Sequence, residues 1–157
     1  MIYVDTVNPD RRAAARALLR RALREEFGIT GELTFTHGEF GKPKLAGYPG
    51  VFFNLSHCRA GAACAVAENE VGLDMMDIRP VSSSVIRRVC TPAELAQVEA
   101  SSAPHRLFCK LWAVKEAYVK LHGGSMLSGV VDTGPLDPFL YERDDFFLCC
   151  FGCGKMS

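Results

Sequence analysis

The chain has no apolar run long enough to cross a membrane. Nothing in its 157 residues approaches the ~20 consecutive apolar residues that a spanning helix needs. The first ten residues, MIYVDTVNPD, lack the basic-then-apolar order of a secretory signal. Eighteen basic and eighteen acidic residues cancel, so no overall charge attracts nucleic acid or a lipid surface. These absences predict a cytoplasmic protein that binds neither nucleic acid nor membrane.

The chain also lacks the cysteine pattern of a disulfide-stabilised or zinc-binding protein. Its seven cysteines are odd in number and scattered, and without a secretory signal they are expected to be reduced thiols. Cys149, Cys150 and Cys153 stand close together, but the chain lacks the two paired C-x-x-C segments of a zinc site. A chain of this length can bury roughly 68–70% of its unfolded surface, so it needs no disulfide or metal to fold.

Apolar periodicity and turn residues divide the chain into strands and helices. Residues 1–7 are predicted to form a strand, and the first helix is expected to start with Asn8 as its cap and to stop at Gly28. A glycine-rich loop with short extended pieces follows over 38–50. The later predicted elements are strands at 51–57, 61–67, 71–76, 128–134 and 146–151, a turn at 68–70 that makes a hairpin of the second and third, and helices from Thr91 and over 104–123.

Strands and helices in this order predict an α+β fold with two halves in one compact unit. The first half is expected to cover residues 1–70 and the second half residues 71–157.

Several polar residues stand where chemistry is possible, but each also has an ordinary structural interpretation. Glu116 and Lys120 lie four residues apart on one helix, and such a pair alone is typical of a solvated surface. Asp74 ends an apolar strand, where a buried carboxylate needs a partner, although a turn or a helix cap would also explain it. His57 and Lys42 would be ordinary surface residues if each were considered singly.

Four motifs in a fixed order change that interpretation. They are GKPKL at 41–45, FNLSH at 53–57, VGLD at 71–74 and LWAVKEAYVK at 111–120. Together they resemble the 4′-phosphopantetheinyl transferase superfamily, in its larger pseudo-twofold type that activates peptide and polyketide synthetases. The last motif is highly specific, and the others are strong jointly. The resemblance implies two pseudo-symmetric halves, each a small antiparallel sheet packed on a long helix.

The resemblance also implies a metal and a catalytic pair. Asp74 and Glu116 match the carboxylates that hold Mg²⁺, while Glu116 and Lys120 match the general base and the lysine near the transferred phosphate. The family's second strand carboxylate is replaced by Met76, and the adjacent Asp77 faces the other side unless the strand bulges. Since Mg²⁺ is held by one or two carboxylates plus phosphates and water, weaker metal binding is expected, not its loss.

Four further residues match positions that contact coenzyme A. Lys42, Ser56 and His57 correspond to the residues that hold its 3′-phosphate and adenosine end. Lys115 matches the lysine before the family glutamate and is predicted to belong to the same binding group, with a less defined role.

The implied function is transfer of the 4′-phosphopantetheine group of coenzyme A to a serine of an apo acyl or peptidyl carrier protein, with release of adenosine 3′,5′-bisphosphate. A monomer would suffice, because both halves lie in one chain. Two alternatives stay open: a non-catalytic coenzyme A or carrier-binding module, which Met76 favours, and a Mg²⁺-dependent phosphohydrolase. The six arginines between Arg11 and Arg24 form either a solvated helix face or a surface for coenzyme A phosphates or an acidic carrier.

Overall fold

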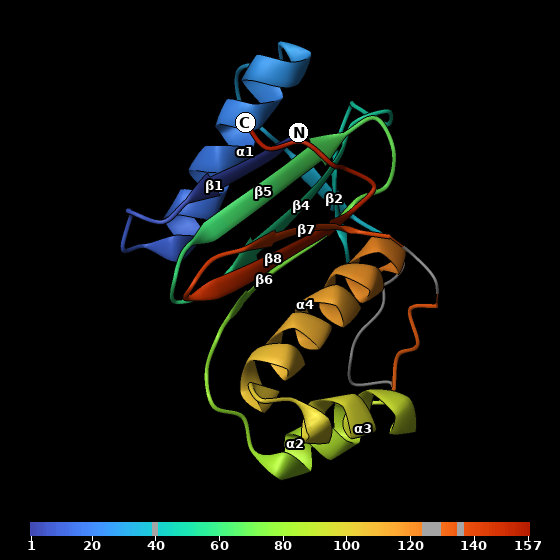
Figure 1. Ribbon diagram of the computed structural model, residues 1–157. Coiled ribbons are helices and arrows are strands. Elements are labelled where there is room, and N and C mark those ends of the chain that lie inside the picture. Colours follow the sequence, from blue (N-terminus) through green and yellow to red (C-terminus); the bar gives the residue numbers. More distant parts are fainter. Residues whose placement is uncertain (39–40, 124–129, 135–136) are drawn as a thin grey trace.

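The computed structural model describes residues 1–38, 41–123, 130–134 and 137–157 (Figure 1). In chain order its elements are β1 (Ile2–Asp5), α1 (Arg11–Phe27), β2 (Phe35–His37), β3 (Pro43–Leu45), β4 (Phe52–His57), β5 (Ala62–Ala67), β6 (Gly72–Asp77), α2 (Ser83–Val89), α3 (Pro92–Ala100), α4 (Pro104–His122), β7 (Phe139–Glu142) and β8 (Phe146–Phe151). None of the helices within these ranges combines the length and the hydropathy that a membrane crossing requires.

Two three-stranded antiparallel sheets share one topology. The first has the strand order β1-β5-β4 and the second the order β6-β8-β7. In both, the first strand is followed by helix, and the last strand returns to the centre of the sheet. A short β2-β3 hairpin stands beside the first sheet. This repetition confirms the predicted α+β fold of two similar halves; the boundary between residues 70 and 71 stays a prediction.

The two sheets and the two long helices stack in layers (Figure 1). The helix α1 packs on the first sheet through the apolar cluster around Leu19, Leu23 and Phe53. A second cluster, which includes Ile2 and Leu73, lies between the two sheets. On the far side of the second sheet, α4 packs through the cluster that contains Ala113, Ala117 and Phe147, and α2 and α3 cover the other side of α4.

A glycine allows β6 to lie unusually close to α4. A Cβ placed on Gly72 would come within 2.0 Å of the carbonyl oxygen of Ala117 and within 2.4 Å of the backbone nitrogen of Leu121. Real Cβ atoms do not approach backbone atoms so closely, so no larger residue fits without moving the helix. This close packing brings the side chains of the last turns of α4 beside those of β6.

The helix ends follow the capping rules, with one difference from the sequence prediction. The cap of α1 is Asp10, whose carboxylate accepts a hydrogen bond from the backbone of Ala13, and not Asn8. The side chain of Asn8 instead accepts a hydrogen bond from the backbone of Asp10, which orders the turn before the helix. The capping box predicted at Thr91 is present.

The strand pairing corrects two predictions. The segments 61–67 and 71–76 do not form a hairpin: β5 pairs with β1 and β4, whereas β6 pairs with β8. β5 pairs with its chain neighbour β4 and with the distant β1, and β6 pairs with the distant β8; periodicity alone cannot reveal which strands pair. The predicted strand at 128–134 is also wrong where it is described, since residues 130–134 form no strand and residues 128–129 lie outside the described ranges. The strand is β7, further along the chain.

Candidate active site

The site lies where the edge strands of the two sheets, β4 and β6, meet without backbone pairing. Asn54 and Ser56 lie two residues apart on the same face of β4, and their side chains reach across to β6. The side-chain oxygen of Asn54 accepts the backbone N–H of Leu73 at 3.0 Å, and the hydroxyl of Ser56 accepts that of Met75 at 3.0 Å. The two side chains therefore satisfy the buried edge of β6 and fix its position relative to β4.

Asp74 is held between the strand and the helix. The hydroxyl of Ser56 donates to Oδ1 of Asp74 at 3.0 Å, and the ammonium of Lys120 donates to the same oxygen at 2.7 Å. Asp74 is only 7% exposed, so this carboxylate needs the partners that it has. Within the described ranges, its second oxygen accepts no hydrogen bond from the protein and is left as a possible ligand atom.

Glu116 lies one turn before Lys120 on α4 and is half-buried. Burial first, and then the negative charge of Asp74, raise the pKa of Glu116 above its usual value, while the charge of Lys120 partly offsets this. No ion pair to Glu116 is found in the described part of the chain. A carboxylate that is destabilised in its charged form by a second carboxylate is an arrangement that favours a cation.

The strand β6 has no bulge at Met76, the residue that replaces the second strand carboxylate. Each residue of β6 from Gly72 to Asp77 faces one residue of β8 in continuous register. Met76 packs against the apolar cluster beneath α4, and Asp77 accepts the backbone N–H groups of Arg59 and Ala60 at 3.0 and 2.9 Å. Asp77 therefore closes the turn after β4 and does not replace the carboxylate that Met76 lacks.

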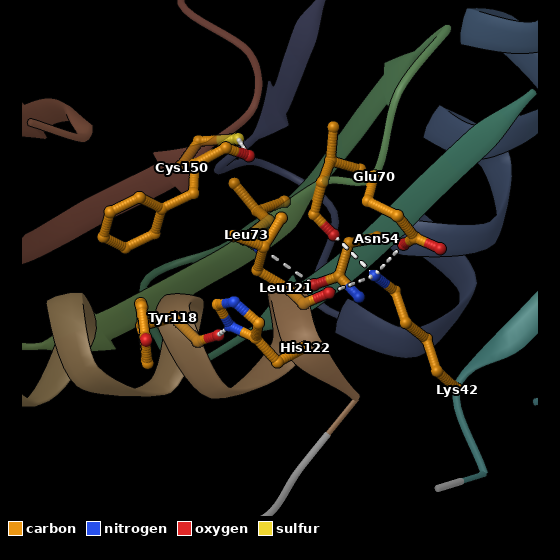
Figure 2. Close-up of polar contacts among 10 residues, drawn as sticks. Lys42, Asn54, Glu70, Leu73, Tyr118, Leu121, His122 and Cys150 are labelled. Atoms are coloured by element: carbon orange, nitrogen blue, oxygen red, sulfur yellow. Dashed lines mark hydrogen bonds and ion pairs between the residues drawn. The ribbon is translucent and has the colours of Figure 1, made fainter. Parts of the chain in front are cut away.

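Lys42 joins three segments at the entrance to β6. Figure 2 shows its side chain reaching between Glu70 and the end of α4. Its ammonium lies 2.6 Å from the carboxylate of Glu70, 2.9 Å from the carbonyl oxygen of Val71 and 3.2 Å from that of Leu121. Lys42 also lines a hollow of about 170 Å³ with Lys44, Tyr48, Phe52 and other residues of the β3 and β4 region.

The structure does not bring all the predicted residues together. His57 ends β4 with an exposed side chain. Lys115 is 1% exposed and points toward α3, away from the site. Its ammonium forms an ion pair with Glu94 of α3 at 2.9 Å and donates a hydrogen bond to the carbonyl oxygen of Val131. It ties α3 to α4, and in this arrangement its ammonium is already occupied by protein groups.

Three polar residues outside the predicted set contact β6 or the predicted lysines. Asn54 stands two residues before Ser56 in the same strand. Side chains two residues apart in a strand point to the same face, so this rule would have identified Asn54 together with Ser56. The capping box at Thr91 draws attention to Glu94, but the sequence does not reveal that Glu70 pairs with Lys42 and Glu94 with Lys115, because these lysines are distant along the chain. In the described ranges, no group of three or more histidine, cysteine, aspartate or glutamate side chains is placed to hold a metal ion.

The arginine-rich face of α1 is partly engaged. Arg11 donates to the carbonyl oxygens of Arg59 and Asn8, and Arg21 forms an i,i+4 ion pair with Glu25 at 2.9 Å. Arg16 and Arg20 instead line an apolar groove of about 410 Å³ between α1, the β2-β3 hairpin and β4.

Comparisons with known proteins agree with this geometry. The model of the 4′-phosphopantetheinyl transferase superfamily matches residues 70–138, the segment that holds Asp74, Glu116 and Lys120. The 4′-phosphopantetheinyl transferase AcpT of Salmonella typhi is 38% identical over 117 residues, covering 71% of this chain and 58% of that protein. A 4′-phosphopantetheinyl transferase of Bacillus subtilis is 28% identical over 131 residues, covering 82% of this chain and 56% of that protein.

A third relative is the 4′-phosphopantetheinyl transferase HetI of Nostoc sp., which is 33% identical over 119 residues, 70% of this chain and 50% of that protein. The chain thus spans about half the length of the curated relatives that it matches. The matched motifs, the repeated sheet topology and these relatives lead to one conclusion: the chain belongs to the 4′-phosphopantetheinyl transferase superfamily.

Proposed function

We propose that the protein transfers the 4′-phosphopantetheine group of coenzyme A to a serine of an apo carrier protein. The observation that carries the proposal is the ion pair between Asp74 on β6 and Lys120, one turn after Glu116 on α4, where burial and the charge of Asp74 raise the pKa of Glu116. Lys120 lies beside both, 2.7 Å from Asp74. Two carboxylates and an ammonium at a strand end suit the binding of a pyrophosphate together with a divalent cation.

The donor set fits Mg²⁺. Hard carboxylate oxygens are its usual protein ligands, and one or two suffice when substrate phosphates and water complete the coordination. We assign the second oxygen of Asp74 and the carboxylate of Glu116 as the protein ligands. When bound, Mg²⁺ would supply neutralising charge for the phosphate oxygens.

The remaining steps belong to side chains of this chain. The hydroxyl oxygen of the carrier serine attacks the β-phosphorus of coenzyme A. The bond from that phosphorus to the bridging oxygen breaks, and adenosine 3′,5′-bisphosphate leaves. Glu116 takes the serine proton; its raised pKa brings it nearer to neutral pH, where a general base contributes typically ~10²–10⁴-fold. Lys120 contacts the transferred phosphate, and such charge-assisted hydrogen bonds are about twice as strong as neutral ones.

We assign the adenosine end of coenzyme A to the β3–β4 side of the molecule. The hollow there is lined by Lys42 and Lys44, which provide positive charge for a 3′-phosphate. His57 is exposed at the end of β4 and could contact the same end, whereas the hydroxyl of Ser56 orients Asp74 and the β6 backbone. The carrier protein is proposed to be an acyl or peptidyl carrier, and the transferase to act as a monomer.

The test incubates the protein with coenzyme A, Mg²⁺ and an apo carrier protein, and measures the mass of the carrier. A gain of one phosphopantetheine supports the transfer. A carrier in which the acceptor serine is replaced by alanine is the matched control and must show no gain. An unchanged mass at every Mg²⁺ concentration, with a folded enzyme, would overturn the proposal.

A second candidate is a non-catalytic module that binds coenzyme A or a carrier protein. Met76 favours it, because the side chain packs into the apolar cluster and leaves two carboxylates where the family has three. Measurable coenzyme A binding with no mass gain would select this candidate. Release of free phosphate from coenzyme A would point to the phosphohydrolase alternative.

A further inference from the structure

The end of β8 carries a pair of cysteines that the proposed transfer does not use. Cys150 is buried in the strand, and Cys153 follows three residues later in a half-buried position. Between them, Gly152 has φ +80°, and a Cβ there would lie 2.3 Å from the carbonyl oxygen of Glu70. Only glycine fits this turn, which folds the chain back after β8.

The turn places the sulfur of Cys153 among hydrogen-bond donors. Met1 directly precedes β1, and its amino group donates to Sγ of Cys153 at 2.9 Å. The thiol of Cys150 donates to the carbonyl oxygen of Phe151 at 3.6 Å, and Cys150 and Cys153 both pack in the apolar cluster between the two sheets. The interaction of the two thiols lowers the pKa of Cys153, an effect that the Met1 nitrogen and the backbone of Lys155 reinforce, and the same interaction and burial raise the pKa of Cys150.

The other cysteines have the opposite environment. Cys58 is also half-buried, but burial and the nearby carboxylate of Asp77 raise its pKa to about 12. The remaining four cysteines, Cys64, Cys90, Cys109 and Cys149, are buried. All seven are free thiols, so Cys58 offers an internal comparison of similar exposure and different surroundings.

We propose that Cys153 and Cys150 form a thiol–disulfide exchange site that takes a low-molecular-weight disulfide as its co-reactant. Two cysteines in one C-x-x-C segment, one accessible and held by donors, the other buried beside it, match the division between an attacking and a resolving thiol. The site lies in the sheet that carries Asp74, because Cys150 faces Leu73 of β6 in the ladder.

The chemistry balances without a further reactant. The thiolate of Cys153 attacks one sulfur of the disulfide RSSR, the S–S bond breaks, and one RS⁻ leaves to give a mixed disulfide. The Cys150 thiol, on losing its proton to the departing thiolate or to solvent, attacks the Cys153 sulfur and expels the second RS⁻. The two protein thiols are oxidised to one disulfide, and RSSR is reduced to two RSH equivalents.

The test treats the protein with cystamine near pH ~6, well below the usual thiol pKa of about 8.5. Remaining thiols are then blocked with a maleimide, and peptide masses identify each cysteine. The wild type should lose two hydrogens at Cys150 and Cys153 and carry no adduct. Cys150→Ser should stop at a cysteamine adduct on Cys153, and Cys153→Ser should leave Cys150 unmodified.

The matched control is Cys58→Ser, which should react as the wild type does. In the wild type, reaction at Cys153 should be at least about tenfold faster than at Cys58, because thiolate content sets the rate. Equal or faster reaction at Cys58, or an unchanged rate at Cys150 in Cys153→Ser, would overturn the proposal. If either variant fails to fold, the comparison of Cys153 with Cys58 in the wild type still decides.

Discussion

Lys120 and Asp74 form an ion pair that joins α4 to β6, with 2.7 Å between Nζ and Oδ1. The hydroxyl of Ser56 donates to the same oxygen at 3.0 Å, so both interactions converge on one side of the carboxylate. The other oxygen then has a fixed direction before any ligand arrives. Such preorganisation is what phosphoryl transfer asks of a protein, since position and charge carry most of its catalysis.

The two aspartates of β6 should differ in their effect on metal dependence. Asp74→Asn removes a proposed ligand, and we expect transfer at limiting Mg²⁺ to fall by at least ~10–100-fold, with recovery at higher Mg²⁺. Asp77→Asn should leave the Mg²⁺ concentration for half-maximal rate unchanged, because Asp77 binds the backbone of the turn after β4. Rates measured across a Mg²⁺ titration test this, and equal shifts in both variants would contradict it.

Restoring the family's missing carboxylate should tighten metal binding. Met76 lies on the same face of β6 as Asp74 and is half-buried, so Met76→Glu would bring a third carboxylate near the site at some cost in packing. The half-maximal Mg²⁺ concentration should fall by about tenfold, as expected for an added charged ligand. Met76→Gln, which has the same length without the charge, should not produce this fall. An equal effect of both substitutions would show that packing, not charge, is responsible.

The motifs single out Asp74 and Lys120, which lie 2.7 Å apart in the structure, but they do not reveal how the strands pair. Motif order identifies Asp74, Glu116 and Lys120 because their spacing on strand and helix is local and fixed by the period of each element. Which strands pair depends on contacts across the whole chain. The hairpin at 68–70 is therefore wrong although both of its strands exist: the edge of β6 is satisfied by the side chains of Asn54 and Ser56.

Partners of buried charges are equally hard to find from sequence. Lys115 is singled out by its motif, but its ion pair with Glu94 depends on how α3 packs on α4. Two neighbouring lysines of one helix thus have different surroundings: Lys120 faces β6, and Lys115 faces α3. Only the packing of the helices distinguishes them.

The pH dependence of stability should reveal the raised pKa of Glu116. Its pKa lies above 4.5 in the folded protein because of burial and the charge of Asp74, so the folded state binds more protons than the unfolded state in this range. Stability is then lost as pH rises from 4.5 through the raised value. With a chelator present, Glu116→Gln should raise the melting temperature at neutral pH and have little effect below pH 4.5.

The same variant should also lose transfer activity by about 10²–10⁴-fold if Glu116 is the base. A Glu116→Gln protein that is no more stable than the wild type at neutral pH would contradict the raised pKa, and one of normal activity would contradict the role as base.

A substitution of Lys115 distinguishes a structural role of this residue from a direct contact with coenzyme A. Lys115→Met leaves the Glu94 carboxylate without its cation, and we expect a loss of about 3 kcal/mol in the free energy of unfolding, since removal of one partner of a buried ion pair leaves an unpaired charge. Lys110→Met, on the same helix and less buried, should change it by less than about 0.5 kcal/mol. Urea unfolding measures both. An unchanged stability with a raised KM for coenzyme A would instead support a direct contact.

Gly72 controls how closely the strand that carries Asp74 approaches the helix that carries Glu116. In Gly72→Ala the added Cβ would lie 2.0 Å from the carbonyl oxygen of Ala117, and the next nearest atoms are also backbone atoms of α4, so no flexible group can move aside. We expect a loss of about 1–3 kcal/mol in stability, together with reduced transfer, because the two carboxylates would separate. The matched control is Gly50→Ala, where nothing lies within 4 Å of the added carbon and both stability and rate should stay near the wild type. If Gly72→Ala retains both properties, the distance between β6 and α4 is not what sets the geometry of the site.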